Sequence, residues 1–292
     1  MSIWQNYHLA YSVEEALQVL AHAPESARVI AGGTDFLLDL QQGRHPPVHT
    51  LVDVTNIPDL NLLMIRQERL FIGAALPLNE IVASTLVNDQ APALIEACSL
   101  IGGPQVRNTA TLGGNVAHAL PAGDGTIALL ALDAQAEVAD LQGIRTTPLS
   151  GLFAGPGLSR LDPGREIITG FWLPLRNPGQ SSAFRRVMRP QGIAIAILNM
   201  AVWLQRRDAL IEDIRIALGP AGAVPLRAVR SEGVLRSQLW NRENFYKVCE
   251  SLLAEASFRT SPHRATKEYR RHLACVLLEE TLSAAWERAA SL

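Results

Sequence analysis

The feature that most constrains the fold is an apolar strand that leads directly into two glycines, a hydroxyl and a carboxylate. The segment is Arg28-Val29-Ile30-Ala31-Gly32-Gly33-Thr34-Asp35, and helix-forming residues follow it from Phe36 to Gln41 until Gly43. Paired glycines accept positive φ angles and let a ligand approach bare backbone, and consecutive N–H groups form a concavity that binds anions. The following helix would direct its positive N-terminal end at the same anion. The segment therefore predicts a phosphate-binding turn.

A second glycine turn of similar build strengthens this interpretation. One pair of glycines alone is also typical of an ordinary strand-to-helix turn with a Thr or Asp cap. The second turn is Thr111-Leu112-Gly113-Gly114-Asn115, and two such turns can clasp one diphosphate. Asp124 follows nine residues after Asn115, just before the apolar segment Thr126 to Leu132. Asp124 is therefore a candidate ligand residue, with a helix N-cap as the competing interpretation.

The order of these motifs resembles the FAD-binding subunit of molybdenum hydroxylases, a family that includes the medium subunits of xanthine dehydrogenase and carbon monoxide dehydrogenase. The matching segments are AGGTD at 31–35, GGPQVRNTATLGGN at 102–115, FRRVMR at 184–189 and HRATKEYRRHL at 263–273. The resemblance thus covers nearly the whole chain.

The resemblance implies an α+β fold: a two-lobed FAD-binding domain of the vanillyl-alcohol-oxidase/PCMH type, followed by a sheet-plus-helices domain. We expect lobe 1 at 1–57, lobe 2 at 58–176 and a C-terminal domain of the CO dehydrogenase flavoprotein type at 177–292. The local patterns agree with this division. A strand, a helix and a second strand fit 28–54, a hairpin fits 62–73, and alternating strands followed by a long helix fit the last region.

The resemblance also implies which residues bind FAD. They are Arg28, Val29, Ile30, Ala31, Gly32, Gly33, Thr34, Asp35, Ile101, Ala110, Thr111, Leu112, Gly113, Gly114, Asn115, Asp124, Ile167, Ile168 and Arg185. The two glycine loops would hold the diphosphate and ribose, and Asp124 would bind the adenosine half. The family commonly has lysine where Arg185 stands and aspartate where Gly192 stands. We expect non-covalent FAD, because neither glycine loop contains a histidine that could be flavinylated.

By resemblance the chain is an FAD-dependent oxidoreductase subunit of the xanthine dehydrogenase type. It would work beside a large subunit with the molybdenum cofactor and a small subunit with 2Fe-2S clusters, in a heterotrimer. FAD would take electrons from the 2Fe-2S clusters and pass them to NAD+ or another acceptor. The alternatives are a stand-alone flavin oxidase and a flavin-free assembly subunit. The intact glycine loops disfavour the latter, since a scaffold needs no close approach to backbone.

Composition and motif content argue against several other functional classes of protein. The net charge is −2 with His neutral, which disfavours a nucleic-acid or anionic-membrane partner. The three cysteines have no C-x-x-C spacing, so we expect free thiols and no metal site in this chain. No segment is apolar enough for a membrane span, which predicts a cytoplasmic protein. Nucleophile, P-loop and zinc-protease motifs are missing, so we expect no catalytic side chain.

Overall fold

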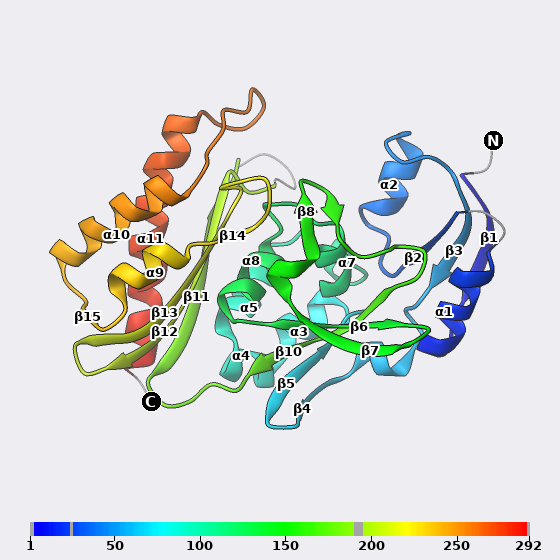
Figure 1. Ribbon diagram of the computed structural model, residues 1–292, viewed down its shortest axis with the longest axis horizontal. Coiled ribbons are helices and arrows are strands. Elements are labelled where there is room, and N and C mark those ends of the chain that lie inside the picture. The colour runs from blue at the N-terminus through cyan, green and yellow to red at the C-terminus, as the bar shows by residue number, and fades with distance from the viewer. Residues whose placement is uncertain (1–2, 24–25, 190–194, 291–292) are drawn as a thin grey trace.

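The computed structural model of the chain describes residues 3–23, 26–189 and 195–290, and its core consists of three sheets with helices. The sheets follow one another along the longest axis in chain order (Figure 1). Gly192, a predicted departure from the family pattern, lies outside the described residues. No helix in the described ranges is long and apolar enough to cross a membrane.

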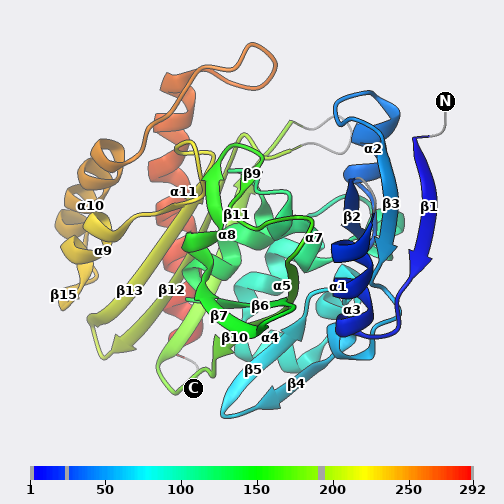
Figure 2. The same ribbon diagram turned by 45° about the vertical axis from the view of Figure 1, so that its right-hand side comes forward.

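The first lobe is a parallel sheet whose edge strand β2 faces the second lobe. The order is β1-β3-β2, and both views show β2 nearest to the rest of the molecule (Figures 1 and 2). Its elements are β1 (Trp4–Leu9), α1 (Val13–His22), β2 (Ala27–Ile30), α2 (Phe36–Gln41) and β3 (Val48–Asp53). Parallel strands need crossover connections, which α1 and α2 supply. The Ser12 hydroxyl caps α1 by accepting from the Glu15 N–H at 3.1 Å.

The second lobe is an antiparallel sheet of order β4-β5-β10-β6-β7, with a helical insertion between β5 and β6. Its sheet strands are β4 (Leu63–Arg66), β5 (Arg69–Gly73), β6 (Gln135–Asp140), β7 (Gly143–Pro148) and β10 (Ile167–Pro174). The insertion contains α3 (Leu78–Ala83), α4 (Thr85–Gln90), α5 (Pro92–Ser99), α6 (Pro104–Arg107), α7 (Leu112–Ala117) and α8 (Asp124–Ala131). Smaller elements are η1 (Pro58–Asn61), η2 (Leu149–Leu152), β8 (Phe153–Gly155) and β9 (Leu158–Ser159).

The third sheet lies between two helical layers. Its strands are β11 (Gln180–Val187), β12 (Leu198–Arg207), β13 (Leu210–Gly219), β14 (Leu226–Arg227) and β15 (Gln238–Leu239). The helices α9 (Val229–Leu235), α10 (Arg242–Glu255) and α11 (Lys267–Ala289) lie on its outer side (Figure 1). On its inner face, Phe184 and Ala201 join the hydrophobic core of the second lobe, next to α5 and α8. One continuous core therefore fixes the third sheet to the second lobe.

These features confirm the predicted α+β architecture of two N-terminal lobes and a C-terminal sheet with helices. The helix predicted from Phe36 to Gln41 and the hairpin predicted at 62–73 are present. The domain limits at 57/58 and 176/177 stay predictions.

Candidate functional site

The two glycine loops meet backbone to backbone. A Cβ added to Gly32 would lie 2.0 Å from the Thr109 carbonyl oxygen and 2.9 Å from the Ala110 Cα. No side chain fits in that space. Gly33 has a φ angle of +65°, which a residue with a Cβ rarely adopts. The two glycines are therefore required for two different reasons, one for the approach of the second loop and one for the turn itself.

The first loop carries unused hydrogen-bond donors. Within the part of the chain that the structure describes, the backbone N–H groups of Gly32, Gly33, Thr34 and Asp35 donate to no protein acceptor. The glycines and Thr34 are half-buried, and Asp35 is exposed. Asp35 is the N-cap residue of α2, but its side chain makes no capping hydrogen bond. Four successive free donors beside a half-open surface make an anion-binding loop.

In the second loop the amides of Gly113, Gly114 and Asn115 have protein acceptors, and the side chain of Thr111 is buried. Thr111 is the N-cap of α7, and its Oγ1 accepts from the Gly114 N–H at 3.0 Å. Gly113 packs on Ala74, whose carbonyl accepts the Gly113 N–H at 2.9 Å. The Asn115 Oδ1 accepts from the Thr126 N–H at 3.0 Å and so fixes the start of α8. An N-cap hydroxyl that already accepts can still donate its own hydrogen to an anion.

Most of the other predicted binding residues are buried or half-buried apolar residues. Ile30, Ala110 and Leu112 are buried, whereas Val29 and Ala31 are half-buried. Ile101 is half-buried and packs against the core of the second lobe. Ile167 and Ile168 are both buried, the former in the core of the first lobe and the latter in that of the second. This favours a core role for the two β10 isoleucines, and their role in binding stays a prediction.

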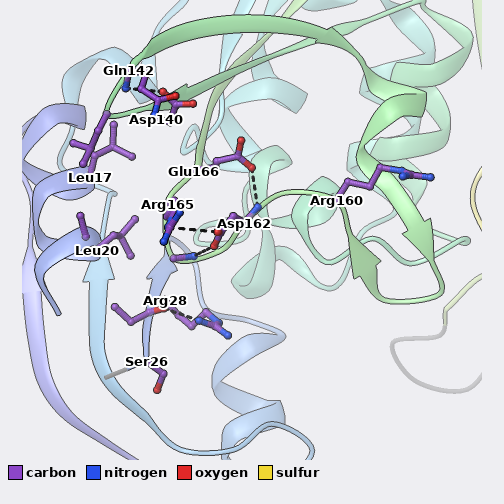
Figure 3. Close-up of a pocket in the computed structure, with 14 residues that line it drawn as sticks. Leu17, Leu20, Ser26, Arg28, Asp140, Gln142, Arg160, Asp162, Arg165 and Glu166 are labelled. Atoms are coloured by element: carbon purple, nitrogen blue, oxygen red, sulfur yellow. Dashed lines mark hydrogen bonds and ion pairs between the residues drawn. The ribbon is translucent and has the colours of Figure 1, made fainter. Parts of the chain in front are cut away.

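A cavity of about 650 Å³ lies between the two lobes at the start of β2 (Figure 3). Leu17 and Leu20 of α1 form an apolar wall, and Glu166 and Arg165 contribute from the loop before β10. Arg28 also lines this cavity; its Nη1 donates to the Ala27 carbonyl at 2.8 Å. The Arg28 guanidinium forms no ion pair with any residue in the described ranges. A free cation next to an apolar wall suits a ligand that is part aromatic and part anionic.

Asp124 links the second lobe to the third sheet. It is the first residue of α8 and not its N-cap, which is Gly123. The Asp124 Oδ2 forms a short ion pair with Arg186 Nη1 of β11, and its Oδ1 accepts from Asn199 Nδ2 of β12 at 2.6 Å. Burial raises the pKa of the Asp124 carboxyl, and the Arg186 charge and the Asn199 hydrogen bond oppose this. Both oxygens are thus occupied by protein, and the predicted contact of Asp124 with adenosine stays a prediction.

Arg186 and Asn199 were not predicted from the sequence as site residues. They are direct neighbours across the β11–β12 pair, and both side chains are buried. A signal for Asn199 was present, because an amide between Leu198 and Met200 interrupts an apolar strand and needs a buried partner. The sequence contained no signal that the partner was Asp124.

Arg185 lies away from Asp124. The Arg185 Nη1 forms an ion pair with Glu96 Oε1 of α5 at 2.9 Å, and Arg288 of α11 binds the same carboxylate. Successive residues in a strand point to opposite faces, so Arg185 and Arg186 cannot both face α8. Any contact of Arg185 with FAD stays a prediction, and Arg186 is the cation next to Asp124.

The Glu96 cluster gives a pH-dependent prediction. Burial raises the pKa of Glu96, but hydrogen bonds from Arg288, the Phe184 N–H and Arg185 outweigh it, so the pKa lies below its ordinary value of 4.5. A lowered pKa stabilises the fold above the unfolded value and loses this contribution as pH falls through the folded value. We expect Glu96→Gln to lower the free energy of unfolding at neutral pH by about 1–3 kcal/mol. Below pH 4.5 the difference should shrink. Urea denaturation across this pH range measures it.

Glu250→Gln is the matched control, because Glu250 is an exposed residue of α10 whose side chain forms no hydrogen bond or ion pair with any described residue. Its effect should stay within about 0.5 kcal/mol at every pH. If Glu96→Gln and Glu250→Gln lowered the free energy of unfolding equally, the Glu96 cluster would not stabilise the fold.

Comparison with known proteins matches both parts of the chain. Residues 3–176 match the family described as FAD binding domain in molybdopterin dehydrogenase, and residues 182–285 match the CO dehydrogenase flavoprotein C-terminal domain. The xanthine dehydrogenase FAD-binding subunit of Escherichia coli O157:H7 is 30% identical over 96% of this chain and 95% of its own length. The nicotine 6-hydroxylase medium subunit of Paenarthrobacter nicotinovorans is 33% identical over 95% of both chains.

A solved structure agrees with the fold. A chain of carbon monoxide dehydrogenase from Hydrogenophaga pseudoflava, in a form that lacks the Mo-pyranopterin moiety of the molybdenum cofactor, superposes with a TM-score of 0.92. It is 28% identical, and the match covers 97% of this chain and 98% of that chain. These matches confirm the two-domain FAD-binding fold predicted from the motifs. The chain therefore belongs to the FAD-binding subunits of molybdenum hydroxylases of the xanthine dehydrogenase and carbon monoxide dehydrogenase family.

Proposed function

We propose that this chain holds FAD non-covalently between its two N-terminal lobes and transfers electrons within a molybdenum hydroxylase. The partners are a large subunit with the molybdenum cofactor and a small subunit with 2Fe-2S clusters, and the final acceptor is NAD+ or another oxidant. The complex is a cytoplasmic heterotrimer. When bound, FAD supplies the chemistry that joins one-electron carriers to a two-electron acceptor.

The observation that carries the proposal is the contact between the two glycine loops. The diphosphate binds the free N–H groups of Gly32 to Asp35, and the Thr111 hydroxyl donates from the opposite loop. A Cβ on Gly32 would fill the space where the loops meet. A flavin-free assembly subunit would need neither the close contact nor the free donors.

The cavity in Figure 3 receives the adenosine end of FAD. It lies at the start of β2, and the anion-binding loop follows the end of the same four-residue strand. The adenine ring packs between the apolar wall of Leu17 and Leu20 and the Arg28 guanidinium. The Glu166 carboxylate beside this cavity is held by Arg145 Nη2 at 2.7 Å and accepts from the Asp162 N–H at 2.7 Å, so it shapes the cavity wall. This assigns Arg28 a specific contact within the predicted site.

Arg28→Ala tests the adenosine contact. The loss of one charge-assisted or cation–π contact costs about 1.5 kcal/mol, so we expect the Kd for FAD to rise about tenfold. Titration of FAD into the flavin-free chain, followed by flavin fluorescence, measures this change. Arg44→Ala is the control, because Arg44 is an exposed arginine that does not line the cavity. An unchanged Kd for Arg28→Ala would contradict the placement of the adenosine in this cavity.

Anaerobic reduction tests the electron-transfer role. A purine, an aldehyde and an N-heterocycle should each leave the flavin of the isolated FAD-loaded chain oxidised, because the substrate reacts at the molybdenum subunit. Reduction by any of them in the isolated chain would favour the stand-alone oxidase. If NAD+ is the acceptor, NADH should reduce the flavin of the isolated chain directly. If NADH does not reduce the flavin, the acceptor is another oxidant.

A further inference from the structure

Two polar contacts fix how α10 and α11 face each other. The Arg271 Nη1 of α11 donates to the Leu253 carbonyl of α10 at 3.0 Å. At the other end of the pair, Arg242 of α10 lies 3.6 Å from the Glu279 carboxylate of α11. The early residue of α10 thus meets the late residue of α11, so the helices run antiparallel. Cys249 lies one turn before Leu253 in α10, and Cys275 lies one turn after Arg271 in α11. In an antiparallel pair this spacing places Cys249 opposite Cys275.

The two cysteines differ in environment but touch each other. Cys249 is buried in the core of the third region, and Cys275 packs against that core while remaining partly exposed. The two thiols are close enough to influence each other. Their interaction and the nearby Arg271 lower the pKa of Cys275 against the effect of burial, and the same interaction and burial raise the pKa of Cys249. Cys275 is therefore the accessible and more reactive thiol, and Cys249 is a shielded neighbour.

We propose that Cys275 and Cys249 form a peroxide-sensitive dithiol that closes into a disulfide between α10 and α11. The Cys275 thiolate attacks one oxygen of hydrogen peroxide, the O–O bond breaks, and hydroxide leaves as water after protonation. The Cys249 sulfur then attacks the sulfenic acid at Cys275, the S–O bond breaks, and a second water leaves with the Cys249 proton. Two thiols are oxidised by two electrons, and one peroxide is reduced to two waters.

The site is separate from the FAD site and does not depend on it. Cys98, the third cysteine, lies fully buried in α5 and has no thiol opposite it among the described residues. The sequence predicts three free thiols without a pairing, because two cysteines 26 positions apart carry no spacing signal. Only the register of α10 against α11 brings two of them together.

Peroxide titration of the full chain tests the proposal. Addition of one equivalent of hydrogen peroxide, followed by unfolding and alkylation, should reduce the count of free thiols from three to one. Non-reducing digestion and mass spectrometry should identify one cross-linked peptide pair that contains Cys249 and Cys275, and dithiothreitol should reverse it. Cys98 is the internal control and should stay alkylated.

Two variants separate the steps. Cys249→Ser should trap the sulfenic acid at Cys275, which dimedone then labels, and Cys275→Ser should leave Cys249 unreacted. Three free thiols after peroxide treatment, a cross-link through Cys98, or irreversible oxidation of Cys275 without a cross-link would each overturn the proposal.

Discussion

Gly32→Ala is expected to lower the affinity for FAD about 100-fold. The added methyl group would lie 2.0 Å from the Thr109 carbonyl oxygen, a distance at which something must move. The neighbouring atoms are backbone, so the two loops must separate, and overpacking of this kind costs up to about 3 kcal/mol. That energy corresponds to a factor of about 100 in Kd. Calorimetric titration of FAD into the flavin-free variant measures the loss.

Gly233→Ala is the matched control for this prediction. Gly233 lies in α9, and a Cβ added there would meet no heavy atom within 4 Å. Alanine is the better helix former by about 1 kcal/mol, so this variant should bind FAD normally and be slightly more stable. If Gly32→Ala bound FAD as tightly as Gly233→Ala, the loops would not act as one diphosphate site.

Asp124→Ala is expected to destabilise the chain by about 3–5 kcal/mol. The substitution leaves the Arg186 guanidinium buried without its counter-charge, and the side chains of Asp124 and Arg186 are only 6% and 8% exposed. It also removes one of the two acceptors of the Asn199 amide and leaves the Ala122 carbonyl as the other. Because these groups join the second lobe to the third sheet, the loss should appear as a lower midpoint in urea denaturation.

Two comparisons isolate the buried charge. Asp133→Ala removes an aspartate that also pairs with arginines but is 58% exposed, so it should cost only about 0–1 kcal/mol. The double variant Asp124→Leu with Arg186→Met should recover most of the lost stability, because an apolar pair of similar volume avoids the desolvation of both charges. If Asp124→Ala lowered the free energy of unfolding no more than Asp133→Ala does, the buried pair would not have the role that we assign to it.

The local features of the site could be predicted from the sequence. The first glycine turn and the α2 helix after it depend on residues within a few positions of one another. Sequence patterns report such short-range structure well, because φ preference and capping act locally. The resemblance added the family and the cofactor, which the local patterns alone did not identify.

The long-range features could not be predicted. Arg186 lies 62 positions from Asp124, and only the placement of β11 against α8 decides that Arg186 and not Arg185 reaches it. A shift of one residue in a strand exchanges the two faces, and the apolar pattern of this segment does not fix the choice.

A crystal structure of the chain with FAD tests the central claim most directly. We expect the diphosphate within hydrogen-bond distance of the backbone N–H groups of Gly32 to Asp35, and the adenosine in the cavity beside Arg28. Density for the diphosphate at any other part of the lobe interface would contradict it.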